Sequence, residues 1–544
     1  MFAVISMIAK LIGALYRIPL TNVMGTEGIG LYQMVFPLYT VLLTATSGGL
    51  PAAVAKVTAG YNATGDARQA RRTLYVTLAA VSSVTTLVAA ALALLRNRIA
   101  FIQGNPLAAV SYLGIAPSIV LVGVISCFRG WYQGSHNMLP SALSQLIEQA
   151  VKLAAGLTLS RMLLPYGVQH AVLGAVLGVT ISEAAALFGL LLQYFFTRRA
   201  ERARTVVRLP AFGRMAAEVS AELAPAARPV TRAELLRRVY RVALPVTLGS
   251  LVIPVTQVID SILVVNMLAR AAGTAAATSL YGVLNGPVNS LINMPVVVTM
   301  AVSVALLPKV SAASATGSDC ARTTETALRY SLLIALPAAL ALAVFSREIL
   351  SVLYARSVRA ELLDAGAALL RYGSVTVVYT AFIQVSTAVL QGCDRPKVPA
   401  VNLVIGAAVK VLATVALLRL IGIYGAVTAS ALCYGVTAAL DAASLKKCAP
   451  VRPPFVRTVA LPLVCAAAAI GGGYGTFVLL SAVLPALWAL VSAAVVIVAL
   501  YGAGLFLSGC LTRAELLGLP AVNRRIDRAA KGNKKKRKNR AKSA

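Results

Sequence analysis

Six basic residues lie within or at the edges of long apolar stretches of this 544-residue sequence: Lys10, Arg17, Lys56, Arg129, Lys152 and Lys410. A charged side chain inside a bilayer is costly, so it normally faces protein or water and marks the path of a substrate. Arg binds phosphate oxygens through paired N–H donors, and Lys binds them as a compact charge. We therefore expect these bases to line a cavity for an anionic substrate, above all a phosphate or pyrophosphate.

Less specific explanations exist for some of these bases. Lys10 and Arg17 are seven residues apart on one face of the same predicted helix, and Lys10 could extend along it to the membrane interface. Glu148 and Lys152 are four residues apart and could simply neutralise one another. Arg17 lies deeper in its apolar stretch, beside Pro19, and this position favours a role in the cavity.

The acidic residues are better suited to act as counter-ions than as catalytic groups. Asp260 and Glu148 could balance the bases or couple transport to an ion. The 18 acidic residues are dispersed, whereas a membrane glycosyl- or phosphotransferase clusters carboxylates around Mg²⁺. His136 and His170 lie at loop edges, and the 7 cysteines show no CxxC spacing. We therefore expect no metal site, no cofactor and no enzymatic activity.

The elements that position these residues are membrane-spanning helices. A mean hydropathy of +0.81, with 59% hydrophobic and only 12% charged residues, excludes an ordinary soluble protein. About 14 stretches have the roughly 20 apolar residues that a helix needs to cross a bilayer. No cleavable signal peptide is expected, because the first apolar stretch contains Lys10 and Arg17 and is followed by no small-residue cleavage site. The sequence predicts an all-α integral membrane protein.

Short repeats divide these helices into two halves. The segment IPLTNV at residues 18–23 returns as IPVTQV at residues 253–258, and AVK at residues 150–152 returns at residues 408–410. We therefore expect two six-helix lobes related by an internal repeat, with two extra helices after them, an architecture that secondary transporters use around a central site. Pro19 and its repeat mate Pro254 are the predicted hinges, since a proline in a span bends its helix.

The repeat and the charge distribution give the predicted domain bounds. They are an N-lobe at 1–196, a cytoplasmic linker at 197–241, a C-lobe at 242–447, a final helix pair at 448–510 and a basic cytoplasmic tail at 511–544.

In this interpretation, the net charge of +32 reflects basic residues that are concentrated on the cytoplasmic side of the membrane. Most of the 50 Lys and Arg residues fall on one side if the N-terminus is inside, which predicts that both termini are cytoplasmic. The basic tail is expected to contact anionic membrane lipids, each base contributing about 1 kcal/mol near the surface. Binding of nucleic acid is not expected, although the tail contains KGNKKKRKNRAK.

Three segments resemble a known family: GALYRIPLTNVMGTEGIGLYQMVFPLY at 13–39, SGGLPAAVAK at 47–56 and RGWYQGSHNMLPSALSQLIEQAVK at 129–152. They look like the stage V sporulation protein B group of the multidrug/oligosaccharidyl-lipid/polysaccharide (MOP) exporter superfamily, which also contains the MurJ lipid II flippases. The sequence begins almost inside the first predicted helix, without the basic stretch usual in this group, so its start is expected to be short or misassigned.

The resemblance implies a transporter in the bacterial plasma membrane that flips an undecaprenyl-pyrophosphate-linked saccharide, such as lipid II, by alternating access. It implies that the last two helices form a lipid-facing groove, and that Arg17 contacts the pyrophosphate. A cation-coupled multidrug exporter on the same scaffold is the alternative, for which Asp260 is the one candidate acid. The protein is expected to be a monomer.

Overall fold

The computed structural model describes residues 2–207, 230–315, 320–355, 357–448 and 456–510. Every regular element in these ranges is a helix, and no strand occurs among them. Of these helices, 11 are long and apolar enough to cross a membrane. The all-α membrane class is therefore confirmed, while the number of about 14 spans stays a prediction.

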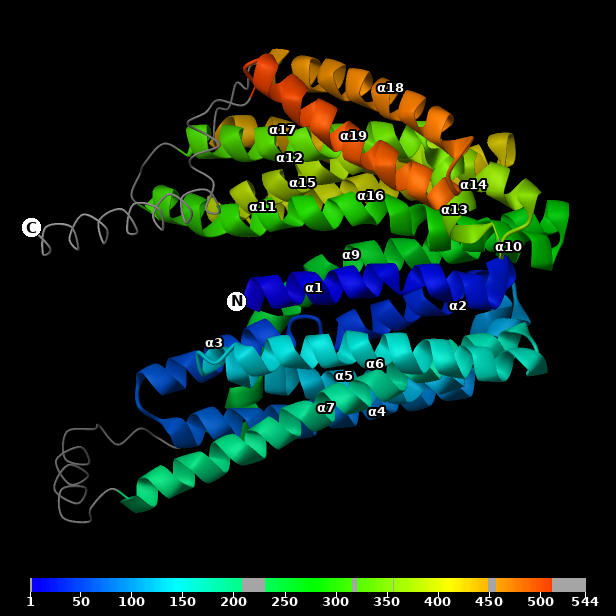
Figure 1. Cartoon of the computed structure of the whole chain (residues 1–544). Helices are drawn as coiled ribbons and strands as arrows, with labels where there is room; N and C mark the ends of the chain where they lie inside the picture. The colour runs from blue at the N-terminus through cyan, green and yellow to red at the C-terminus, as the bar shows by residue number, and fades with distance from the viewer. Residues whose placement is uncertain (1, 208–229, 316–319, 356, 449–455, 511–544) are drawn as a thin grey trace, which may run out of the picture.

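The first seven helices form one bundle, in which α4 and α7 pack on α5, and α6 packs on α7 (Figure 1). We call this bundle the N-lobe. Its helices are α1 (Phe2–Leu15), α2 (Arg17–Ser47), α3 (Leu50–Ala63), α4 (Ala67–Ile102), α5 (Ala109–Gly134), α6 (Leu139–Leu163) and α7 (Val168–Val207).

The second bundle, the C-lobe, is built around the packing of α11 on α15 and of α16 on α17. A π-helical turn, Leu284–Val288, joins α10 to α11. The helices are α9 (Arg232–Ala272), α10 (Thr274–Val283), α11 (Asn289–Ala315), α12 (Ala321–Val344), α13 (Ser346–Tyr354), α14 (Ala360–Gly373), α15 (Val375–Gly392), α16 (Lys397–Ile421) and α17 (Ile423–Cys448).

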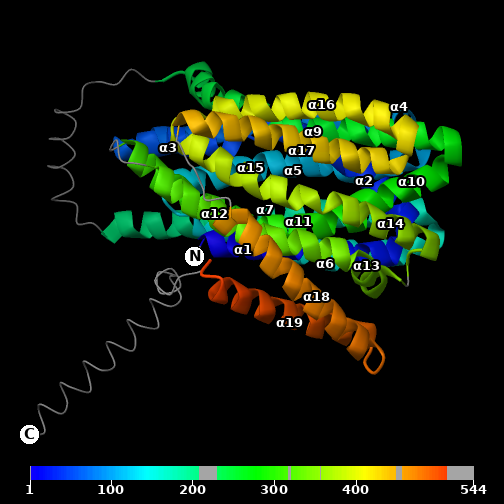
Figure 2. The ribbon, with the colours of Figure 1, turned by 90° about the horizontal axis from the view of Figure 1, so that it is seen from above.

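The last two helices, α18 (Leu461–Ser481) and α19 (Ala486–Leu507), pack on each other outside the C-lobe, against α12 and α13 (Figure 2). They expose many large apolar side chains, including Leu479, Trp488 and Val498. A contiguous apolar surface of this kind needs a lipid environment.

Two breaks divide the first part of the chain. Pro19 has no N–H to bond the carbonyl of Leu15, and the helix is interrupted one residue later, at Tyr16. Further on, the backbone leaves helical geometry at Gly25, with φ 70° and ψ −173°. The long apolar stretch Leu11–Ala63 is therefore not one continuous helix, but contains parts of α1, α2 and α3 with a kink inside α2. Pro254, the other predicted hinge, lies inside the unbroken α9.

The two lobes touch tightly where α2 crosses α10. A Cβ atom at Gly30 would lie 2.1 Å from the carbonyl oxygen of Thr278, and one at Gly282 would lie 2.3 Å from the carbonyl oxygen of Thr26. Only glycine permits so close a crossing, as in other membrane helix pairs with small residues at the contact.

Polar side chains join the lobes at this same end. Asn22 Nδ2 donates to the carbonyl of Leu353 at 3.0 Å, and Asn105 Nδ2 donates to Thr278 Oγ1 at 3.0 Å. We call these contacts and the α2–α10 crossing the inter-lobe seal. The seal lies at the end of the molecule opposite the start of α1 and the end of α19 (Figure 1).

The predicted linker at 197–241 is helical at both described ends, because α7 continues to Val207 and α9 begins at Arg232. Its middle lies outside the described residues, as do the tail at 511–544 and the side chain of Lys10.

Candidate functional site

Arg17 lies at the contact between the lobes. The break at Tyr16 sets the start of α2, and Arg17 is its first residue. The guanidinium Nη1 donates to Ser290 Oγ, on α11 of the C-lobe, at 3.4 Å. The charge also lies close enough to Tyr32 and Tyr354 to interact with their phenol groups. Among the described residues, no carboxylate forms an ion pair with Arg17.

Lys152, on α6, points toward the same region. Its Nζ lies 5.1 Å from the centroid of the Phe36 ring and 5.9 Å from that of the Tyr16 ring. Both distances suit cation–π contacts, which stabilise a cation away from water. The charges of Lys152 and Arg17 interact with one another, so these two predicted bases are brought together.

Carboxylates beside Lys152 balance part of this charge. Glu148 accepts from Arg129 Nη2 at 2.9 Å and from Gln149 Nε2 at 2.9 Å. Arg129 also donates from Nε to Ser144 Oγ at 3.0 Å. The direct ion pair of Glu148 is therefore with Arg129, and Lys152 interacts with Glu148 at longer range.

Glu183, on α7, is a second acid in this network. Its side chain is 7% exposed, and its charge interacts with those of Lys152 and Glu148. Within the described part of the chain, its Oε2 has no hydrogen-bond partner. We call Arg17, Lys152, Arg129, Glu148 and Glu183 the N-lobe charge network.

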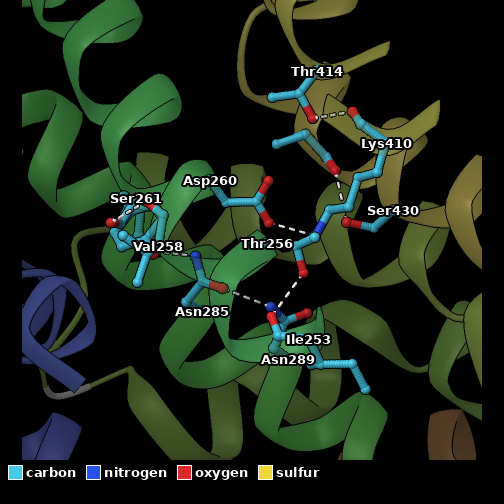
Figure 3. Close-up of polar contacts among 12 residues, drawn as sticks. Ile253, Thr256, Val258, Asp260, Ser261, Asn285, Asn289, Lys410, Thr414 and Ser430 are labelled. Atoms are coloured by element: carbon cyan, nitrogen blue, oxygen red, sulfur yellow. Dashed lines mark hydrogen bonds and ion pairs between the residues drawn. The ribbon is translucent and has the colours of Figure 1, made fainter. Parts of the chain in front are cut away.

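Two further predicted residues, Asp260 and Lys410, lie in a separate cavity of about 630 Å³ inside the C-lobe. Asp260 of α9 forms an ion pair there with Lys410 of α16 (Figure 3). Their side chains are only 18% and 11% exposed. The predicted counter-ion and the predicted base are therefore partners of each other, away from Arg17.

Amide side chains line the wall of this C-lobe cavity. Asn289 Nδ2 donates to Asn285 Oδ1 at 2.8 Å (Figure 3). Asn293 Nδ2 donates to the carbonyl of Asn289 at 2.7 Å. Sequence reasoning missed these residues and Ser290. Three asparagines spaced by four in an apolar segment are the signal that could have found them.

Lys56 lies elsewhere. It is exposed at the middle of α3, in a surface groove with the first turns of α9. The five predicted bases whose side chains are described thus lie in several places, because their helices belong to different parts of the two lobes. In the described ranges, no group of three His, Cys, Asp or Glu residues could hold a metal ion.

This group of residues can bind an anion. Among the described residues that form it, no nucleophilic side chain contacts a general base. A guanidinium without a carboxylate partner among the described residues, a nearby ammonium and the buried hydroxyl of Tyr354 all converge where the lobes meet. No hydrogen bond partners the Tyr354 hydroxyl in the described structure. These groups match the oxygens of a phosphate or diphosphate.

Two family models and several curated proteins match this chain. The family model described as polysaccharide biosynthesis protein matches residues 1–314, and the MatE model matches residues 245–415. Stage V sporulation protein B of Bacillus subtilis (strain 168) is 27% identical over 464 residues, covering 82% of this chain and 82% of that protein. Lipid II flippase MurJ of the same organism is 25% identical over 451 residues, covering 78% of each.

Solved structures share the fold. Lipid II flippase MurJ in an inward closed conformation aligns with a TM-score of 0.68 and 12% identity, covering 92% of this chain and 97% of that one. An inward-facing multidrug resistance MATE family transporter of the MOP superfamily aligns with a TM-score of 0.58 and 13% identity, covering 81% and 96%.

Proposed function

Because the chain belongs to the polysaccharide biosynthesis protein family of the MOP exporter superfamily, we propose that it flips a lipid-linked saccharide across the bacterial plasma membrane. The substrate carries a pyrophosphate between an undecaprenyl chain and the sugar, as in lipid II or a related cell-wall or polysaccharide precursor. The names of two relatives, a lipid II flippase and a sporulation protein, support this substrate class.

The observation that carries the proposal is the unpaired Arg17 guanidinium between the lobes. A charged side chain in a membrane-spanning helix normally has a partner of opposite charge. In the described structure, no carboxylate of the protein forms an ion pair with Arg17. The pyrophosphate would take that place, with Arg17 donating to its oxygens and Lys152 adding a second positive charge. Arg129 pairs with Glu148, and this ion pair keeps the Glu148 carboxylate from competing with the pyrophosphate for Lys152.

Alternating access follows from the position of the inter-lobe seal. The seal closes one end of the molecule, predicted to be the outer end, while the headgroup enters from the other. Opening the seal and closing the inner end would carry the headgroup outward. The undecaprenyl chain would stay in lipid along α18 and α19, whose exposed apolar side chains suit it.

A cation-coupled drug exporter is the second candidate, favoured by the MatE match and by Asp260 in the C-lobe cavity. Such a transporter needs an acid that is free to bind and release a cation. Asp260 is already neutralised by Lys410, which supports the flippase instead.

Complementation tests the proposal. The gene is expressed in a strain depleted of its own lipid II flippase, and growth and lipid II export are measured. We expect the parent and Arg161→Ala, an exposed change on α6, to restore growth, and Arg17→Ala to fail. Absence of rescue by a parent protein that is present in the membrane would overturn the proposal.

A further inference from the structure

A basic groove of about 640 Å³ opens on the surface between α3 and α9, outside the N-lobe charge network. Helix α3 contributes one face, which includes Lys56, and α9 contributes the face that includes Arg237 and Arg241. All three of these side chains are exposed. They lie on the face of the molecule predicted to be cytoplasmic.

One wall of this groove is fixed by internal contacts. Arg238 donates from Nη2 to Glu234 Oε1 at 2.6 Å and from Nη1 to the Tyr61 hydroxyl at 3.2 Å. Glu234, the one acid among the described residues that line the groove, is thereby already paired with Arg238. Across the described residues, Lys56, Arg237 and Arg241 have no acidic partner.

We propose that this α3–α9 groove binds one phosphate-bearing anion, and that its physiological source is the headgroup of an anionic phospholipid. Three unpartnered cations in one concave site repel each other until an anion binds between them, and Arg and Lys both favour phosphate oxygens. Basic pockets between membrane helices at the cytoplasmic side are suited to lipid headgroups. The site does not depend on the identity of the transported substrate.

The groove also spans the junction of the lobes. Lys56 belongs to the N-lobe, whereas Arg237 and Arg241 belong to the first helix of the C-lobe. Just beyond the groove the two helices are in contact, because the Gly49 N–H donates to Thr247 Oγ1 at 3.1 Å. A bound headgroup therefore links the lobes and favours the state in which α3 and α9 lie together.

Native mass spectrometry of the full chain tests this site. The parent is titrated with short-chain phosphatidylglycerol, with phosphatidylcholine of equal chain length and with inorganic phosphate. We expect one saturable phosphatidylglycerol site that Arg237→Gln/Arg241→Gln weakens at least about tenfold. Lys56→Gln, on the opposite helix, should weaken it as well. Lys446→Gln/Lys447→Gln removes two exposed charges from α17, outside the groove, and should leave this site unchanged.

The outcomes separate the sources and the alternatives. Tighter binding of phosphatidylglycerol than of inorganic phosphate supports the lipid headgroup, and equal binding supports a soluble phosphate at the same residues. Circular dichroism and the thermal midpoint in phosphatidylcholine confirm that each variant is folded. Equal binding of the two phospholipids, or an equal loss in the α17 control, overturns the site. An effect of the α9 arginines without any effect of Lys56 overturns the link between lobes.

Discussion

At the residue scale, the buried charges belong to two separate groups, one in each lobe. Arg17 and Lys152 come together between the lobes, and Lys410 is paired with Asp260 inside the C-lobe. The sequence indicated that these residues matter, because charges in apolar stretches are rare and costly. It could not indicate their partners, because each pair joins two different helices: Arg129 and Glu148 lie on the consecutive helices α5 and α6, and Lys410 and Asp260 are 150 residues apart.

The Asp260–Lys410 pair makes a prediction at this scale. Removing one partner of a buried ion pair costs about 3–5 kcal/mol, because the other charge is left unpaired. We expect Asp260→Asn and Lys410→Met each to lower the thermal midpoint strongly, and the double variant to recover most of the loss. If the pair is structural, the double variant also flips substrate.

Transport by the double variant decides between a counter-ion and a coupling role for Asp260. A folded Asp260→Asn/Lys410→Met protein that fails to flip lipid II in vesicles would contradict the structural role and would favour the cation-coupled alternative.

At the element scale, the sequence predicted only some of the breaks between and within the helices. Pro19 was expected to bend the first helix, and the structure places a break at Tyr16. Pro254, its repeat mate, lies in an α9 that stays continuous, because neighbouring packing can maintain a helix through a proline. The turn at Gly25 was hidden inside an apolar stretch, since one glycine in such a stretch is no boundary signal.

Pro19→Ala tests the element that positions Arg17. An alanine at this position has an N–H that can donate to the carbonyl of Leu15, so α1 and α2 could join into one continuous helix, which proline at this position prevents. We expect a higher thermal midpoint together with flipping reduced several-fold, because straightening the helix turns Arg17 away from Ser290. Pro254→Ala is the matched change in the other lobe. A Pro19→Ala variant that flips substrate as fast as the parent would contradict a role for this break.

At the scale of the whole molecule, the internal repeat predicted two bundles and two added helices, and the described helices form such bundles with α18 and α19 outside them (Figure 1, Figure 2). The contacts between bundles were not predictable, because they depend on glycines and polar side chains without a local pattern, such as Gly30 and Asn105. For the same reason, Lys56 was grouped with cavity bases although it lies in the α3–α9 groove.

The central claim is that bases between the lobes bind the diphosphate of the substrate. Equilibrium binding of lipid II to the purified full chain tests it most directly, with inorganic pyrophosphate as competitor and Arg161→Ala as control. A charge-assisted hydrogen bond contributes about 1.5–3 kcal/mol, so we predict that Arg17→Ala weakens binding roughly 10- to 100-fold and that Arg161→Ala does not. Pyrophosphate should displace lipid II from the parent. Unchanged affinity in Arg17→Ala, with no competition by pyrophosphate, would contradict the claim.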